Sequence, residues 1–246
     1  MSMRAQIEAM RALGYYTAAG IDGALKHPDK ETARKTQDRV DLLIPIVKAW
    51  FTDLGNEIAS LGVQVHGGMG FIEETGAAQH LRDARILPIY EGTNGIQAND
   101  LVGRKLGRDR GEAARELIGD MRASLGELDA PELAVLRQRL TDATAAFDTA
   151  TAYLVTAEPA LAAAGSAPYL NLCGTVLGGW LMARVAAAAL RRHDAALSAA
   201  RSSPGAFLSS PTSARISATS PSIVSPPSLA ILRPTRSRAW MPLVPS

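Results

Sequence analysis

The chain has 246 residues, enough to bury the core of one large domain or two small ones. Its formal net charge of +2 is unevenly distributed, because the Ser- and Pro-rich stretch 201–246 contains five arginines and no acidic residue, whereas the preceding 200 residues contain 21 basic and 24 acidic side chains. A mildly acidic body without a basic face argues against a nucleic-acid-binding protein.

The first part of the chain has the pattern of two long helices. Apolar residues three and four positions apart predict a helix over 3–26, and Asp29 or Thr32 can cap the next one. We expect that second helix to end at Gly62. Its apolar stripe consists of Leu43, Val47, Trp50, Leu54, Ile58 and Leu61.

Shorter helical patterns follow a glycine-rich loop at 67–70. They lie at about 75–85 and 92–106, and a linker at 107–111 separates them from patterns at about 112–127, 131–164 and 168–199. Val and Ile are sparse beside Ala and Leu, and no alternating strand pattern is present. The sequence therefore predicts an all-α fold: an antiparallel helical bundle over 1–106, a second small helical domain over 112–200 and a disordered Ser/Pro-rich tail over 201–246.

Cys173 is the single cysteine of the chain, so an intrachain disulfide is impossible. Its apolar helical surroundings favour a buried structural thiol over a nucleophile. Gly178 and Gly179 predict the close approach of a neighbouring helix. The chain starts without a signal peptide, and its longest apolar run, Val185–Leu190, is too short to span a bilayer. These features predict a cytoplasmic protein without a membrane span.

Two features have a chemistry that the residues alone leave open. The segment Gln64–Phe71 contains three glycines, which either form a plain turn or let backbone N–H groups approach an anionic ligand. Glu91 stands at a predicted helix start. There a carboxylate either stabilises the helix by about 0.3–1 kcal/mol or acts as a general base beside N–H groups that hold a developing oxyanion.

Three blocks between Leu61 and Leu106 resemble the signature of the acyl-CoA dehydrogenases. In order, they are Gln-x-x-Gly-Gly-x-Gly-Phe from Gln64, Arg-Asp-Ala from Arg82, and Ile-Tyr-Glu-Gly-Thr-x-x-Ile-Gln from Ile89. Residues 112–200 resemble the extra helical domain of a larger subgroup, so the resemblance covers about 1–200. It implies a truncated form that lacks the family's N-terminal helical domain and middle β-domain.

The reaction of this family is the α,β-dehydrogenation of an acyl-CoA thioester with FAD as cofactor. The resemblance implies that Glu91 removes the α-proton while the β-hydride passes to the flavin, and that Gly92 lines the substrate pocket. It implies that Thr93 and Asn94 contact the FAD, and it implies no metal. The residues expected to contact the FAD of a neighbouring subunit are Gln64, Val65, His66, Gly67 and Gly68.

The partners implied by the resemblance are an acyl-CoA substrate, electron-transfer flavoprotein as acceptor, and further copies of the chain in a homo-oligomer. Gly95 departs from the family pattern, since many members have Gln there and gain a contact with FAD. The missing domains also carry FAD-binding residues, so we expect the isolated chain to be inactive. The alternative is a noncatalytic helical remnant that packs only with itself or with a full-length relative.

Overall fold

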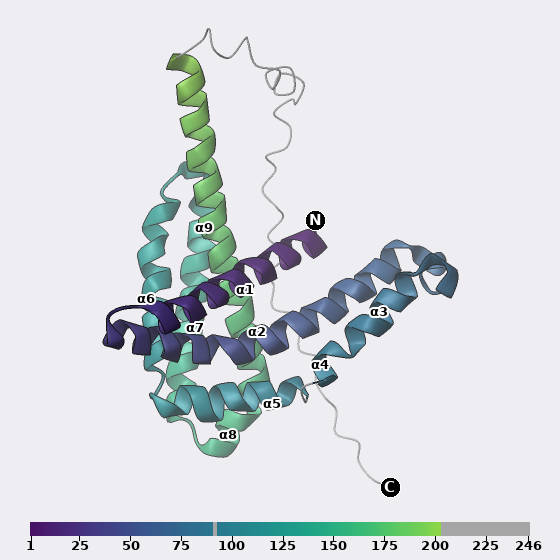
Figure 1. Ribbon diagram of the computed structural model, residues 1–246, viewed down its shortest axis with the longest axis horizontal. Coiled ribbons are helices and arrows are strands. Elements are labelled where there is room, and N and C mark those ends of the chain that lie inside the picture. Colours follow the sequence, from purple (N-terminus) through teal and green to yellow (C-terminus); the bar gives the residue numbers. More distant parts are fainter. Residues whose placement is uncertain (91–92, 203–246) are drawn as a thin grey trace.

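The computed structural model describes residues 1–90 and 93–202, and within these ranges the regular secondary structure is helical, without a strand. The predicted all-α fold is therefore confirmed (Figure 1). Glu91 and Gly92 lie outside the described residues, as does the chain beyond residue 202. The predicted disorder of the tail accordingly stays a prediction.

Helices α1 (Ser2–Lys26) and α2 (Lys30–Val65) form an antiparallel pair at the N-terminal end. The predicted cap is confirmed, because the carboxylate of Asp29 accepts a hydrogen bond from the backbone N–H of Thr32 at 2.8 Å. Hydrogen bonds from Thr32, first from its hydroxyl and then from its backbone, lower the pKa of the Asp29 carboxyl. These contacts fix where α2 begins.

The predicted end of α2 at Gly62 is wrong, because the helix continues to Val65. The N–H of His66 still reaches the carbonyl of Gly62 at 3.3 Å, so the hydrogen-bond ladder runs past that glycine. A left-handed backbone, which glycine adopts without penalty, first occurs at Gly67, where φ is 62°. The chain therefore turns five residues later than the sequence pattern indicated.

The second half of α2 leaves the bundle and forms an arm with the segments that follow it (Figure 1). Short 3₁₀ turns at Gly67–Gly70 and Glu73–Thr75 reverse the chain, and α3 (Ala77–Arg85) runs back along α2. Helices α4 (Leu87–Tyr90) and α5 (Asn94–Asn99) then return to the bundle, and α5 continues into a wider π-helical segment, Asp100–Leu106. The arm is thus a helical hairpin that only its base joins to the core.

The C-terminal half consists of α6 (Glu112–Ser124), α7 (Ala134–Thr156), α8 (Pro159–Ala164) and α9 (Ser166–Ser202). The helical pattern expected over about 131–164 is divided into α7 and α8, because the backbone of Ala157 is extended. Pro159 takes the first position of α8, and the carboxylate of Glu158 accepts from the N–H of Ala160 at 3.0 Å. A new cap at this point separates α8 from α7.

One buried apolar cluster joins the two halves of the chain. It contains residues of α1, α2, α5, α6, α7 and α9, and its largest members include Leu13, Ile46, Phe147 and Trp180. Helix α9 packs against both α1 and α2. The predicted close approach at Gly178 is confirmed, since a Cβ there would lie 2.8 Å from the ring of Trp50, whereas at Gly179 nothing lies within 4 Å.

The short connection 107–111, expected to be a linker, is tied to α2 by ion pairs. Arg108 contacts Asp38 and Asp41, each with an N–O distance of 2.9 Å. Arg39 of α2 makes a further link to α6, where its guanidinium lies 2.6 Å from Asp120. The connection therefore has a fixed position against the N-terminal pair of helices.

Helix α9 includes a stretch, Ser166–Ala196, that is long and apolar enough to cross a membrane by length and composition alone. Half of its most apolar window is buried against the rest of the molecule, and a buried core helix meets the same criteria of length and composition. Cys173 lies in this buried part and is 1% exposed, so the predicted buried thiol is confirmed. Burial raises the pKa of that thiol.

Candidate functional site

The tip of the arm carries the predicted glycine-rich block. The residues from Gln64 to Gly68 are all exposed, and a Cβ at Gly67 or Gly68 would meet no other atom within 4 Å. Gly70 is different: a Cβ there would lie 2.3 Å from the carbonyl oxygen of Val63, so only glycine fits. The tip is a tightly closed turn with an open outer face.

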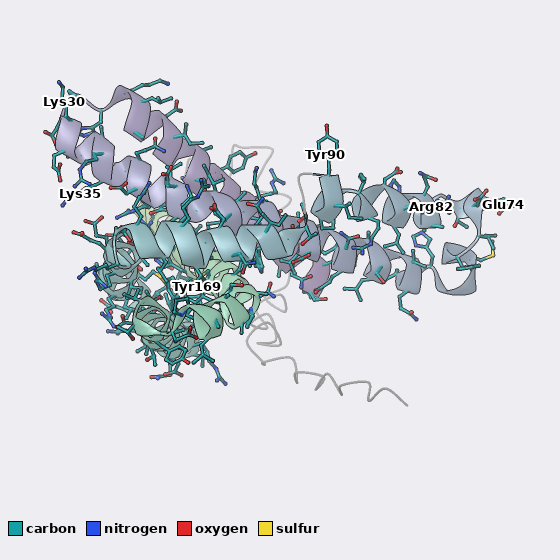
Figure 2. The ribbon with its side chains drawn as sticks, turned by 90° about the horizontal axis from the view of Figure 1, so that it is seen from below. Lys30, Lys35, Glu74, Arg82, Tyr90 and Tyr169 are labelled. Carbon is teal, nitrogen blue, oxygen red and sulfur yellow. The ribbon has the colours of Figure 1, made fainter. Side chains whose placement is uncertain are left out.

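A groove of about 500 Å³ lies just behind this tip, between α2 and α3. Its wall is mainly apolar, with one ion pair at 3.5 Å between Glu73 and Arg82. Figure 2 shows Arg82 and Glu74 near the far end of the arm. The lining residues are Val63, Phe71, Ile72, Glu73, Ala78, Leu81 and Arg82.

The third predicted block lies at the base of the arm. Tyr90, 81% exposed, ends α4 and points away from the helices (Figure 2). Thr93 caps α5 by accepting a hydrogen bond from the N–H of Gly95 at 3.2 Å. The helix start expected near Gly92 is therefore at Asn94, and the candidate base Glu91 and the candidate pocket residue Gly92 are outside the described residues.

Asn94 is bound to α2 through its side-chain amide. Its Nδ2 donates to the carbonyl oxygen of Ala49 at 3.1 Å, to Oγ1 of Thr52 at 2.9 Å and to Oδ1 of Asp53 at 2.7 Å. An amide nitrogen has two protons, so at least one of them is shared between two acceptors. Thus the donor side of Asn94 is fully used within the chain.

The two parts of the predicted cofactor site are well separated. Asn94 contacts α2 at Asp53, and the exposed block begins at Gln64, eleven residues further along the same helix. Eleven residues of α-helix span roughly 16 Å. The structure therefore does not bring Gln64–Gly68 together with Thr93 and Asn94, an arrangement compatible with contacts to two different cofactors.

Sequence patterns did not reveal the polar residues of α2 that hold this region. Thr52, Asp53 and Asn56 lie half-buried, and Nδ2 of Asn56 donates to the carbonyl oxygen of Ala84 at 3.2 Å. The available signal was a run of polar residues beside the apolar stripe of α2. Such a run is equally typical of a solvated helix face, so only the packing distinguishes the two.

Across residues 1–90 and 93–202, no three His, Cys, Asp or Glu side chains are grouped closely enough to hold a metal ion. Nδ1 of His66 donates to the carbonyl oxygen of Gly62 at 2.9 Å. It therefore acts as part of the helix end in this structure.

Comparisons with known proteins agree with the three blocks. The family model for the acyl-CoA dehydrogenase C-terminal domain matches residues 1–106, and the model described as acetyl-CoA dehydrogenase C-terminal like matches residues 117–210. The chain belongs to the acyl-CoA dehydrogenase family. Both matches are to C-terminal parts of that family's proteins.

Two curated acyl-CoA dehydrogenases show how much of a family member the chain represents. The 3-methylmercaptopropionyl-CoA dehydrogenase of Ruegeria pomeroyi is 47% identical over 194 residues, which are 77% of this chain and 33% of that protein. The broad-specificity linear acyl-CoA dehydrogenase FadE5 of Mycobacterium tuberculosis is 34% identical over 207 residues, 79% of this chain and 34% of its own. The chain therefore spans about a third of the length of these acyl-CoA dehydrogenases.

A solved structure, Bd2924 in its apo form, has a TM-score of 0.54 to this chain at 21% identity. The alignment covers 74% of this chain and 32% of the other. At this identity the likeness shows the fold only. It supports the helical arrangement seen in this acyl-CoA dehydrogenase chain.

Proposed function

We propose that this chain is the C-terminal helical part of an FAD-dependent acyl-CoA dehydrogenase and contributes Glu91 as the catalytic base for α,β-dehydrogenation of an acyl-CoA thioester. The observation that carries the proposal is the family match over residues 1–106, a range that contains all three blocks and, within the third of them, Glu91. The described flanks, Tyr90 and Thr93, lie at the open base of the arm, where a substrate can approach.

The proposed chemistry removes two hydrogens from neighbouring carbons. The Glu91 carboxylate takes the α-proton, the electron pair of that C–H bond forms the Cα=Cβ double bond, and a hydride leaves the β-carbon. The bound FAD supplies the acceptor for this hydride. Negative charge develops on the thioester oxygen, and the backbone N–H of Glu91 is the donor that we assign to it. Gly92, without a side chain, leaves room for the substrate.

The residues assigned to FAD lie in two separate places, the tip and the base of the arm. The open backbone at Gly67 and Gly68 has room for a phosphate-bearing ligand, since a Cβ there would meet nothing within 4 Å. Val65 and His66 are exposed beside it, and Gln64 is exposed on the last turn of α2. At the base of the arm, Thr93 is exposed. The side-chain amide of Asn94 has only its oxygen available for a ligand, because its two protons are hydrogen-bonded to α2.

The partners that we propose follow from the family. They are an acyl-CoA substrate, electron-transfer flavoprotein as the acceptor of the electrons, and other copies of the subunit, since Gln64–Gly68 and Thr93 are too far apart to contact a flavin at one point. The lone, buried Cys173 is compatible with a reducing compartment, and we propose a cytoplasmic location.

A second candidate is a noncatalytic helical remnant. The observation that favours it is that the chain spans about a third of its relatives' length, while the arm and the base of the arm stay exposed. This candidate predicts a stable helical protein that never yields an active flavoprotein, whatever domains accompany it.

The experiment that separates the two joins the chain to the preceding two thirds of the Ruegeria pomeroyi relative. We expect the chimera to bind FAD and to reduce an artificial acceptor with an acyl-CoA substrate. Glu91→Gln removes the base but keeps its shape, so kcat should fall about a thousandfold with little change in acyl-CoA affinity. The matched control is Glu74→Gln on the exposed arm, which should leave kcat unchanged.

Two outcomes would decide against the proposal. A chimera that folds with FAD but turns over equally well with Glu91→Gln has another base. A chimera that folds but never binds FAD favours the remnant. The isolated chain should be colourless and inactive, because base, thioester and flavin must be positioned together for the reaction.

A further inference from the structure

The connection between α3 and α5, which contains Glu91, is attached to α2 at both of its ends. At the α3 end, Nδ2 of Asn56 donates to the carbonyl oxygen of Ala84 at 3.2 Å. At the α5 end, Nδ2 of Asn94 donates to Asp53 and Thr52 of α2. The residues of α2 that make these attachments lie between Ala49 and Asn56.

Thr52 joins these two attachments. Its backbone oxygen accepts from Nδ2 of Asn56 at 2.9 Å, and its side-chain Oγ1 accepts from Nδ2 of Asn94 at 2.9 Å. Oγ1 of Thr52 is itself held by the carbonyl oxygens of Lys48 and Ala49, at 2.9 and 3.0 Å. One turn of α2 therefore presents a preformed set of acceptors to both amides.

The burial of Asn56 is explained by this attachment. Its Oδ1 is buried and accepts no hydrogen bond from any described residue, which is unfavourable for a polar atom. Its Nδ2, in contrast, bridges the turn of α2 and the end of α3. A buried Asn56 whose Oδ1 stays unsatisfied is consistent with a structural role for its Nδ2.

We infer that Asn56 and Asn94 are positioning residues: together they hold the two described flanks of the connection, the end of α3 and the start of α5, against α2. In the sequence, the proposed base Glu91 stands one residue after Tyr90, which ends α4, and three residues before Asn94, which begins α5. The inference rests on the proposed function only for the role of Glu91, not for the attachment itself.

This inference also changes the role expected for Asn94. The family resemblance implies a contact between Asn94 and FAD, but the three contacts of Nδ2 direct its protons to Ala49, Thr52 and Asp53. The side-chain amide of Asn94 thus donates its hydrogen bonds within the protein itself. Truncating it should loosen the connection even where no cofactor is bound.

Native-state hydrogen exchange on the full 246-residue chain tests the attachment. The reporting amides are those of Ile89 and Tyr90, which donate to the carbonyl of Ile86, and that of Ile96, which donates to Thr93. We expect Asn56→Ala and Asn94→Ala to accelerate exchange at these amides about tenfold or more. Amides of the core part of α9 should keep their protection.

The matched control is Asn99→Ala, in the same helix as Asn94. Oδ1 of Asn99 accepts from Oγ of Ser166 in α9 at 2.9 Å, and Asn99 makes no side-chain hydrogen bond with the described residues of α2. Its truncation should change exchange at Ile89 and Tyr90 less than twofold. Equal acceleration in all three variants, or acceleration spread over the whole chain, means general destabilisation and overturns the inference.

A reversal of donor and acceptor gives a second, independent test. Asn94→Asp places a carboxylate against Asp53, so exchange should be faster than in Asn94→Ala. Adding Asp53→Asn restores a donor and an acceptor at the same two positions. The double variant should recover most of the lost protection, and failure to recover any of it would count against a specific Asn94–Asp53 contact.

Neither exchange test needs a cofactor or turnover, so both tests are independent of the activity test on Glu91. If the asparagine variants lose protection as expected and the Glu91→Gln chimera keeps full activity, the proposed base is wrong and the attachment stands. Unchanged protection in both asparagine variants overturns the attachment whatever the chimera does.

Discussion

Gly174 of α9 lies directly against the indole ring of Trp50 of α2. A Cβ at Gly174 would be 2.3 Å from Cγ of Trp50, a ring that is itself 6% exposed and has little room to move. This contact joins the C-terminal half of the chain to the N-terminal pair of helices. The shared core therefore requires glycine at position 174, because any side chain there would overlap the ring of Trp50.

Gly174→Ala should destabilise the protein by about 1–3 kcal/mol, because the added methyl group overfills a packed core. The control is Gly179→Ala in the same helix, where a Cβ meets nothing within 4 Å, and where alanine should stabilise by about 0.5–1 kcal/mol. Urea unfolding followed by circular dichroism measures both. Equal midpoints for the two variants would show that Trp50 moves aside without cost.

Ser124→Ala should cost about 1–3 kcal/mol, since it leaves the buried indole N–H of Trp180 without an acceptor. In the structure Nε1 of Trp180 donates to Oγ of Ser124 at 2.7 Å, and both side chains are buried. Thr149→Ala, which removes an exposed hydroxyl bonded within its own helix, should stay within about 0.5 kcal/mol of the wild type. Chemical unfolding of the two variants side by side gives the comparison.

Asp41 should contribute to stability at neutral pH and lose that contribution in acid. Burial raises the pKa of its carboxyl, but hydrogen bonds from Gln37 and Arg108 and the charges of Lys105 and Arg108 outweigh burial, so the net pKa is lowered. A depressed folded-state pKa stabilises above the unfolded value, about 3.9, and the gain disappears as the pH falls through the folded-state value.

Asp41→Asn should therefore cost about 0.5–1 kcal/mol at pH 7, a small amount because Arg108 is about half exposed and solvent screens the pair. The difference from wild type should shrink below pH 4 and in 1 M salt. Asp22→Asn, which removes an exposed pair with Lys26, is the control and should change the urea midpoint little. A difference that persists at pH 2 would assign the effect to packing instead of charge.

Cys173 should not react with a thiol reagent in the native state. The side chain is 1% exposed, and burial raises its pKa, so neither access nor thiolate is available. After unfolding in guanidinium chloride, one equivalent of reagent per chain should react. No other thiol contributes to the signal, because the sequence has one cysteine. Rapid reaction in native buffer would mean that the packing around this part of α9 opens.

The sequence predicted the helical class, the cap at Asp29 and the buried thiol correctly. Each of these depends on local features: apolar periodicity, a side chain that bonds a nearby N–H, or an apolar neighbourhood. It placed the end of α2 too early because a glycine is compatible with a helix interior as well as with a helix end. Only the backbone hydrogen bonds that continue past Gly62, such as the one from His66 to Gly62, show that this glycine lies inside the helix.

The candidate site was predictable as a set of motifs but not as an arrangement in space. The blocks at Gln64 and Ile89 lie on either side of the Arg82 block and resemble one family signature. The arm nevertheless places the first roughly 16 Å along α2 from the point where Asn94 is held. Which helix would receive the amides of Asn56 and Asn94 was likewise invisible, because side-chain hydrogen bonds over 28 and 41 residues have no local pattern.

By itself, the sequence determined where the chain is helical and which family signature it carries, because both are written in residue types at short spacings. The tertiary structure alone decided that the two halves share one core, that Gly174 must stay bare against Trp50, and that one turn of α2 holds both ends of the connection around Glu91. These are properties of surfaces that meet only after the helices have packed.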